Sequence, residues 1–64
     1  MVKINGKDLD AAGRSIAEIV TDEGYDCVRV AVELNEKIIS KTEYESTVLR
    51  DGDRVEIISF VGGG

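Results

Sequence analysis

The sequence contains no histidine, proline or tryptophan, and its single cysteine is Cys27. Without histidine, the chain lacks the side chain most used for general acid–base catalysis, and no cluster of residues has the spacing of a metal site. One cysteine cannot form an internal disulfide, so we expect a reducing, cytoplasmic setting. A self-contained enzyme and a metalloprotein are therefore disfavoured. Cys27 has no histidine or second cysteine nearby in the sequence, so a small filler residue is preferred over a redox or persulfide role.

The composition is that of one small globular domain. The chain has 64 residues, of which 42% are hydrophobic and 33% charged, and its net charge is −5. An acidic chain of this kind is a poor ligand for the phosphates of nucleic acids and a better one for basic protein surfaces. It has no apolar run long enough for a signal peptide or a membrane span, so we expect no membrane association.

Apolar and polar residues alternate in five short stretches, and a helical period interrupts them once. Asn5-Gly6 is a strong signal for a tight hairpin turn. Asn35-Glu36 is a second turn, and the polar stretch 40–46 is expected to be a loop with one helical turn. In chain order, the pattern predicts strands over 1–4 and 7–10, a helix over 15–23, strands over 28–34 and 37–39, and a last strand from residue 54.

The predicted helix has clear ends. Ser15 and Glu18 fit a capping box, and Gly24 is a natural terminator. Three apolar residues at helical spacing, Ile16, Ile19 and Val20, form the stripe expected to face the sheet. With one helix packed on one face of a mixed, mostly antiparallel sheet, the order β-β-α-β-β-β is that of an α+β roll of the β-grasp (ubiquitin-like) kind. Tyr25 and Tyr44 are expected to cover the edges of its core.

The segment 50–53 contains two aspartates, Asp51 and Asp53, around a glycine. Aspartate and glycine supply the backbone angles of a turn. A calcium loop would need more oxygen ligands at set spacings, and these are missing, so the turn is preferred over a metal site.

The last strand is apolar on both faces and runs into three glycines. Val55 and Ile57 share one face, which we expect to pack on the helix, whereas Ile58 and Phe60 lie on the other with Glu56. We therefore expect Ile58, Phe60 and Val61 to form an exposed docking face for a partner. The expected domain is 1–61, followed by a flexible tail, 62–64, because glycine adds no packing and loses the most entropy on ordering.

The whole chain resembles the ubiquitin-like sulfur-carrier family, and most closely the thiazole-biosynthesis carriers of the ThiS type. The resemblance lies in the opening Val2-Lys3-Ile4-Asn5-Gly6, in 30–35 and 51–57, and above all in the Ser59-Phe60-Val61-Gly62-Gly63-Gly64 ending. It implies that an E1-like adenylyltransferase of the ThiF type uses ATP and magnesium to adenylate the Gly64 carboxylate. A persulfide from a cysteine desulfurase or another donor would then yield a thiocarboxylate, whose sulfur a thiazole synthase of the ThiG type would accept.

In this interpretation Gly62 and Gly63 thread into the partner, the chain binds no permanent cofactor, and the free carrier is a monomer.

Other functions stay open. The chain could serve molybdopterin synthesis or another thiolation pathway, or it could be a ubiquitin-like modifier joined to lysines through Gly64. It could also be a plain binding module that uses Ile58 and Phe60, with the glycines as a frayed end.

Overall fold

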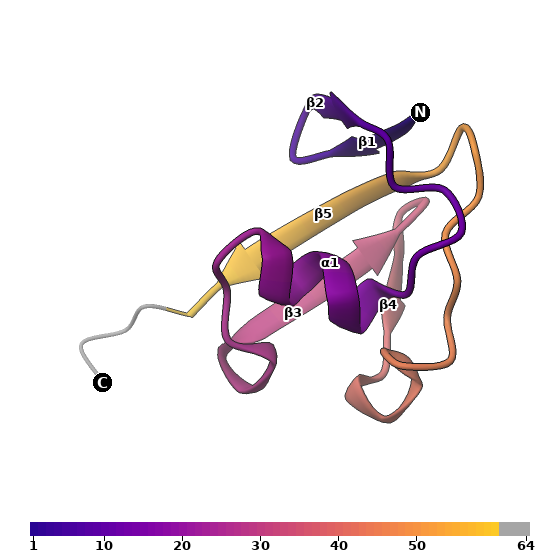
Figure 1. The fold of residues 1–64 in the computed structure, drawn as a ribbon. Helices are drawn as coiled ribbons and strands as arrows, with labels where there is room; N and C mark the ends of the chain where they lie inside the picture. The colour runs from indigo at the N-terminus through magenta and orange to yellow at the C-terminus, as the bar shows by residue number, and fades with distance from the viewer. Residues whose placement is uncertain (61–64) are drawn as a thin grey trace.

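The computed structural model describes residues 1–60, and in this part of the chain the predicted order of five strands and one helix is confirmed (Figure 1). Two short 3-10 helices, η1 and η2, complete the described elements. Their bounds are β1 Val2–Ile4, β2 Lys7–Leu9, α1 Ile16–Asp22, η1 Cys27–Arg29, β3 Val30–Leu34, β4 Lys37–Ile39, η2 Lys41–Glu43 and β5 Arg54–Ser59. The boundary proposed between a domain, 1–61, and a tail, 62–64, lies outside the described residues.

The strands form one mixed sheet in the order β2-β1-β5-β3-β4, so β5 is its central strand. Three of the four strand pairings are antiparallel, and only β1 and β5 run parallel. Two tight turns connect the antiparallel hairpins. Asn5 and Gly6 join β1 to β2 with φ of +49° and +85°, and Asn35 and Glu36 join β3 to β4 with φ of +52° and +71°. Positive φ at both central residues gives a turn whose twist matches that of the flanking strands.

Helix α1 begins and ends where the sequence predicts. The Ser15 hydroxyl accepts a hydrogen bond from the Glu18 N–H at 3.1 Å, and the Glu18 carboxylate accepts one from the Ser15 N–H at 3.0 Å. At the other end Glu23 is the C-cap, and Gly24 follows with φ of +87°. The capping box therefore satisfies two orphan N–H groups of a helix too short to be stable without its packing.

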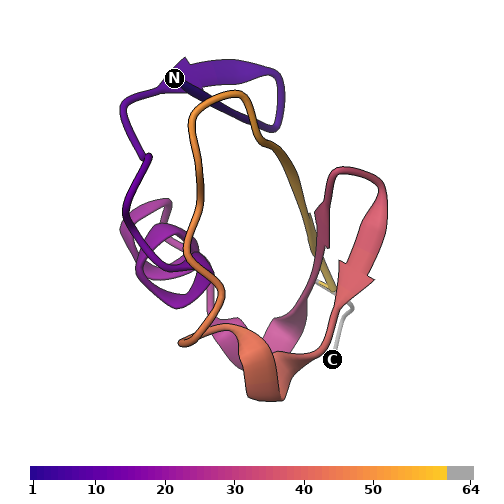
Figure 2. The same cartoon turned by 90° about the vertical axis from the view of Figure 1, so that its right-hand side faces the viewer.

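The helix and the sheet form two layers with the core between them (Figure 2). The helical stripe meets the inward side chains of the strands, and all twelve core residues are less than a tenth exposed. They are Val2, Ile4, Ala11, Ile16, Ile19, Val20, Val30, Val32, Tyr44, Leu49, Val55 and Ile57. The face of the sheet opposite α1 carries no layer within residues 1–60 (Figure 2).

The segment between η2 and β5 packs along the start of the helix and completes the core (Figure 2). Its carbonyls accept hydrogen bonds from the first helical N–H groups, Ile16 N–H to Thr47 at 3.0 Å and Ala17 N–H to Tyr44 at 2.9 Å. This arrangement draws the Tyr44 side chain inward, where it is 3% exposed. The expectation that Tyr44 covers only a core edge was therefore wrong, whereas Tyr25 is half-buried against the core as predicted.

The predicted strand 28–34 begins two residues too early. The Asp26 carboxylate accepts a hydrogen bond from the Val28 N–H at 2.9 Å and caps the 3-10 helix η1, so β3 starts only at Val30. Val28 is consequently 76% exposed and does not share the inward face of Val30 and Val32. A local side-chain acceptor has here prevailed over the β-propensity of valine. At the hairpin, two smaller differences are that β1 starts at residue 2 and β2 ends at residue 9.

The aspartates of segment 50–53 are used in a turn, as predicted. Asp53 accepts hydrogen bonds from the Arg50 N–H at 2.9 Å and from the Asn35 side chain at 3.0 Å, and Asp51 pairs with the Met1 amine. No group of three potential metal ligands occurs within residues 1–60. In the same described part of the chain, no helix has the length and apolarity needed to cross a membrane.

Candidate functional site: the free face of the sheet and its central strand

The strand that precedes the glycines is held along both edges. On one edge β5 pairs with β3 over five residue pairs, from Val30 opposite Ser59 to Leu34 opposite Val55. The Phe60 N–H extends this edge by donating to the Arg29 carbonyl at 2.8 Å. Since both neighbours of β5 are themselves paired further out, the last described residues of the chain start from a firmly positioned strand.

On its other edge, β5 pairs with the short strand β1, and a side chain lengthens the pairing. The Asn5 N–H donates to the Val55 carbonyl at 2.9 Å. At the next step β1 has already turned away, and the Asn5 side-chain oxygen accepts the Ile57 N–H instead, at 2.8 Å. The Asn5 amide also donates to the Tyr25 hydroxyl at 3.3 Å. Asn5 thus acts as a turn residue and as a substitute for the missing carbonyl of β1.

We use the name free face for the side of the sheet turned away from α1. Inward and outward side chains alternate along each strand, and Val55 and Ile57 mark the inward set. The outward residues that make up the free face are Lys3, Asp8, Ala31, Glu33, Ile38, Arg54, Glu56 and Ile58.

The apolar part of the free face lies toward the end of β5. Ile58 is 45% exposed and is the direct cross-strand partner of Ala31. Phe60, just beyond the strand, is 57% exposed, and Ile38 on β4 is 76% exposed. The predicted exposure of Ile58 and Phe60 is confirmed, and Ile38 is an addition that its neighbour Ile39 could have indicated, because two adjacent strand residues cannot both face the core.

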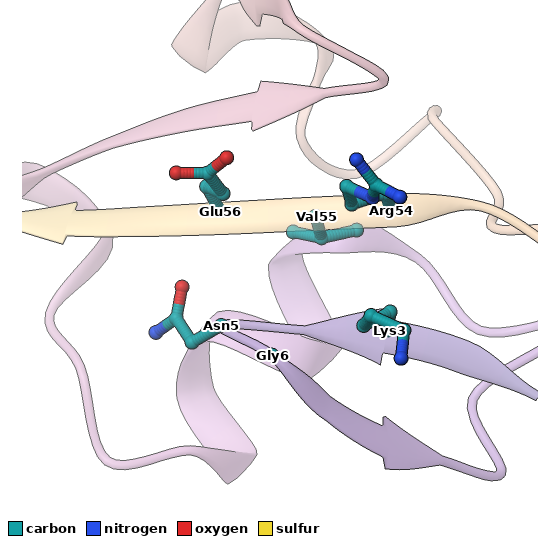
Figure 3. A pocket seen from close by; sticks show the side chains of 6 residues that line it. All are labelled: Lys3, Asn5, Gly6, Arg54, Val55 and Glu56. Atoms are coloured by element: carbon teal, nitrogen blue, oxygen red, sulfur yellow. The ribbon is translucent and has the colours of Figure 1, made fainter.

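The charged part of the free face lies toward the start of β5. Lys3 stands opposite Arg54, and Glu33 stands opposite Glu56. A shallow depression lies at the end of β1, between Asn5, Arg54 and Glu56 (Figure 3). The face therefore changes from basic to acidic to apolar along β5.

The other predicted site residues fall in two groups. Val61, Gly62, Gly63 and Gly64 lie outside the described residues. Cys27 is half-buried and packs against the core, as expected of a filler residue, and its carbonyl accepts a hydrogen bond from Lys41 Nζ at 3.1 Å. Burial raises the pKa of the Tyr44 hydroxyl, with a smaller contribution from the Cys27 thiol when it is charged.

One helix packed on one face of a mixed five-stranded sheet, with β5 at its centre, is the architecture of a β-grasp domain. The ThiS family model matches residues 2–64, and the chain belongs to the ThiS family. It is 36% identical to the sulfur carrier protein ThiS of Thermus thermophilus over 64 residues, which is the whole of both chains. The crystal structure of the thiamine biosynthesis protein ThiS from Geobacter metallireducens is similar, with a TM-score of 0.77 and 30% identity over 98% of this chain and 97% of that one.

A second kind of relative is much longer. The thiazole synthase of Paramagnetospirillum magneticum is 37% identical over 62 residues, which is 95% of this chain and 19% of that protein. The chain spans about a fifth of the length of the thiazole synthases it matches. A domain similar to this one therefore exists as a segment of a longer polypeptide.

Proposed function

We propose that this chain is a sulfur carrier of thiamine biosynthesis and that the Gly64 carboxylate carries the sulfur. The observation that supports this most strongly is the ThiS family match, which extends through the glycines to residue 64. The absence of histidine from the sequence fits the same role, because a carrier that is activated by another protein needs no acid–base residues of its own.

The chemistry of the proposed cycle begins at the Gly64 carboxylate, which is a poor electrophile. An E1-like adenylyltransferase of the ThiF type, with ATP and magnesium, would join this carboxylate to AMP and release pyrophosphate. The terminal sulfur of a persulfide, supplied by a cysteine desulfurase or another donor, would displace AMP and form an acyl disulfide. A thiol reductant would then cleave the disulfide and leave the thiocarboxylate. Gly62 and Gly63 lack a Cβ, so a partner's backbone can approach them closely.

We further propose that thiazole synthase accepts the sulfur. Two relatives named thiazole synthase contain a segment similar to this chain, and fusion holds a donor and its acceptor at a high effective concentration. As a separate polypeptide, the chain would reach the same enzyme by diffusion as a cytoplasmic monomer.

Intact mass spectrometry tests the proposal. The chain is incubated with the adenylyltransferase of its own organism, ATP, magnesium, a persulfide donor and a thiol reductant. The expected product is heavier by the difference between one sulfur and one oxygen atom. Omitting ATP, or deleting Gly63 and Gly64, abolishes this gain while circular dichroism shows an unchanged fold.

Two results would contradict the proposal. Covalent adducts with lysines of other proteins would identify a modifier, and an unchanged mass under all conditions would leave only a binding module. Single-turnover transfer then identifies the pathway. We expect thiazole synthase to consume the thiocarboxylate, and its consumption by molybdopterin synthase alone would assign the chain to that alternative.

A further inference from the structure

Two glutamates on the free face stand directly opposite each other on neighbouring strands. Glu33 of β3 is the cross-strand partner of Glu56 of β5, and both side chains point away from α1. Side chains directly opposite in an antiparallel pair have Cβ atoms roughly 5 Å apart, and like charges at that separation oppose folding. The pair therefore works against the stability of a domain small enough to have little to spare.

The cations of the free face leave this repulsion in place. Lys3 pairs with Asp8 at 3.3 Å, and no ion pair within residues 1–60 includes Glu33 or Glu56. Figure 3 shows the Arg54 guanidinium and the Glu56 carboxylate at separate places along β5. The two carboxylates thus form an acidic site that lacks a cation among the described residues.

The surroundings of the pair are those of an interface. Glu33 is also the cross-strand partner of Ile38, and Ile58 follows Glu56 on the same face. Ile38 and Ile58 are 76% and 45% exposed, so apolar side chains flank the carboxylates on two sides. Apolar groups beside an uncompensated charge pair fit a protein surface that offers an apolar patch and a cation together.

We propose that Glu33 and Glu56, with Ile38 and Ile58, form the docking surface for thiazole synthase, and that this enzyme presents a guanidinium or ammonium group to both carboxylates. The inference rests on the proposed function. Charge complementarity selects a basic patch on the partner, and the relatives named thiazole synthase, in which a similar domain belongs to the same polypeptide, favour this enzyme as the occupant. A planar guanidinium can donate to two carboxylates at once, so arginine suits the site best.

The double variant Glu33→Gln/Glu56→Gln tests the proposal against the matched double variant Glu43→Gln/Glu45→Gln. The control residues are exposed and lie in or beside η2, away from the free face, so both variants lose the same charge. Binding to thiazole synthase of the same organism is measured by calorimetry at low and moderate salt. We expect the free-face variant to bind about tenfold more weakly, with a flatter salt dependence, and the control to change less than about twofold.

Thermal unfolding shows whether weaker binding comes from the lost charges or from a damaged fold. The free-face variant should melt a few degrees higher than the wild-type chain, because the facing charges are gone. Weaker binding together with a higher melting temperature supports the proposal. Equal losses in both variants, or unchanged affinity of the free-face variant, would overturn it. The proposal would also be overturned if the free-face variant bound thiazole synthase normally and bound only the adenylyltransferase more weakly.

The failure of this inference is distinguishable from that of the proposed function. Both double variants retain residues 62–64, and their sulfur loading is read separately by intact mass. If the wild-type chain acquires sulfur and the free-face variant still binds normally, only the docking surface is wrong. If no chain acquires sulfur, the proposed function fails whatever the affinities are.

Discussion

Asn5 offers the sharpest test of how β5 is held in place. Its side-chain oxygen accepts the Ile57 N–H at 2.8 Å, and its backbone has φ of +49°. Replacing Asn5 by alanine removes the acceptor and places an ordinary residue in the left-handed region. A partly buried N–H left without a partner costs about 1–2 kcal/mol, and the backbone conformation adds about 1 kcal/mol. We therefore expect Asn5→Ala to lower the free energy of unfolding by about 2–3 kcal/mol.

Two further variants separate these contributions. Asn5→Gly tolerates positive φ but lacks the acceptor, so it should lose about 1–2 kcal/mol, with some additional loss from the flexibility of the unfolded chain. Asn5→Asp keeps an acceptor and also tolerates positive φ, so it should lose less than about 1 kcal/mol. Among the described contacts of Asn5, this variant loses the amide donor of the long hydrogen bond to the Tyr25 hydroxyl, at 3.3 Å.

Urea unfolding followed by circular dichroism measures these differences, since the chain has no tryptophan to report on folding. In a domain of this size, each kcal/mol also lowers the melting temperature by about 4–8 °C. Hydrogen exchange supplies local detail. The Ile57 amide should exchange faster in Asn5→Gly than in Asn5→Asp, beyond any difference in global stability. Equal stability of the glycine and aspartate variants would refute the argument, because it would mean that the side-chain acceptor contributes nothing.

Three other predictions follow from the described contacts. Ser15→Ala should cost about 1 kcal/mol in urea unfolding, because it removes the hydroxyl that accepts the Glu18 N–H, while the Ser15 backbone N–H can still donate to the Glu18 carboxylate. Val30→Ala should cost about 2 kcal/mol, whereas Val28→Ala should change stability by less than about 0.5 kcal/mol, and equal costs would contradict a strand that begins at residue 30. Burial raises the pKa of Tyr44 in the folded chain, so the folded state holds this proton more tightly than the unfolded state. That contribution to stability is complete below the unfolded pKa of about 10 and is lost as pH rises through the higher folded value, and Tyr44→Phe should remove this loss in alkaline titrations of the free energy of unfolding.

The elements of this fold were predictable because most of them follow from local patterns. The alternation around Val55 and Ile57 gave the two faces of β5, and Ser15 with Glu18 gave the start of the helix. The error at Val28 has a local cause too, since Asp26 is a suitable capping residue for a short 3-10 turn. The alternating valines were simply the stronger pattern in the sequence.

What the sequence did not predict depends on contacts between distant segments. The burial of Tyr44 follows from the hydrogen bond of its carbonyl to the Ala17 N–H, across 27 positions of the chain. The pairing of Glu33 with Glu56 depends on the register of β3 against β5, and neither strand alone contains that information. The exposure of Ile58 and Phe60 was predictable because it depends only on the alternation of side chains along one strand. The pairing of the two glutamates depends on how two strands are aligned.

The position of β5 also limits how a partner can recognise this domain. A peptide that adds a strand to a sheet needs a free edge, and β3 occupies one edge of β5 over five residue pairs, whereas β1 pairs only with Arg54 and Val55 on the other edge. The edge strands of the described sheet, β2 and β4, have three residues each and offer little backbone for such pairing. Near the end of β5, beyond the Asn5 contact at Ile57, a partner can therefore use the β1-side backbone edge as well as the outward side chains. It follows that substitutions along this strand divide by parity. We expect changes at Val55 and Ile57 to lower stability, and changes at Glu56 and Ile58 to act mainly on binding.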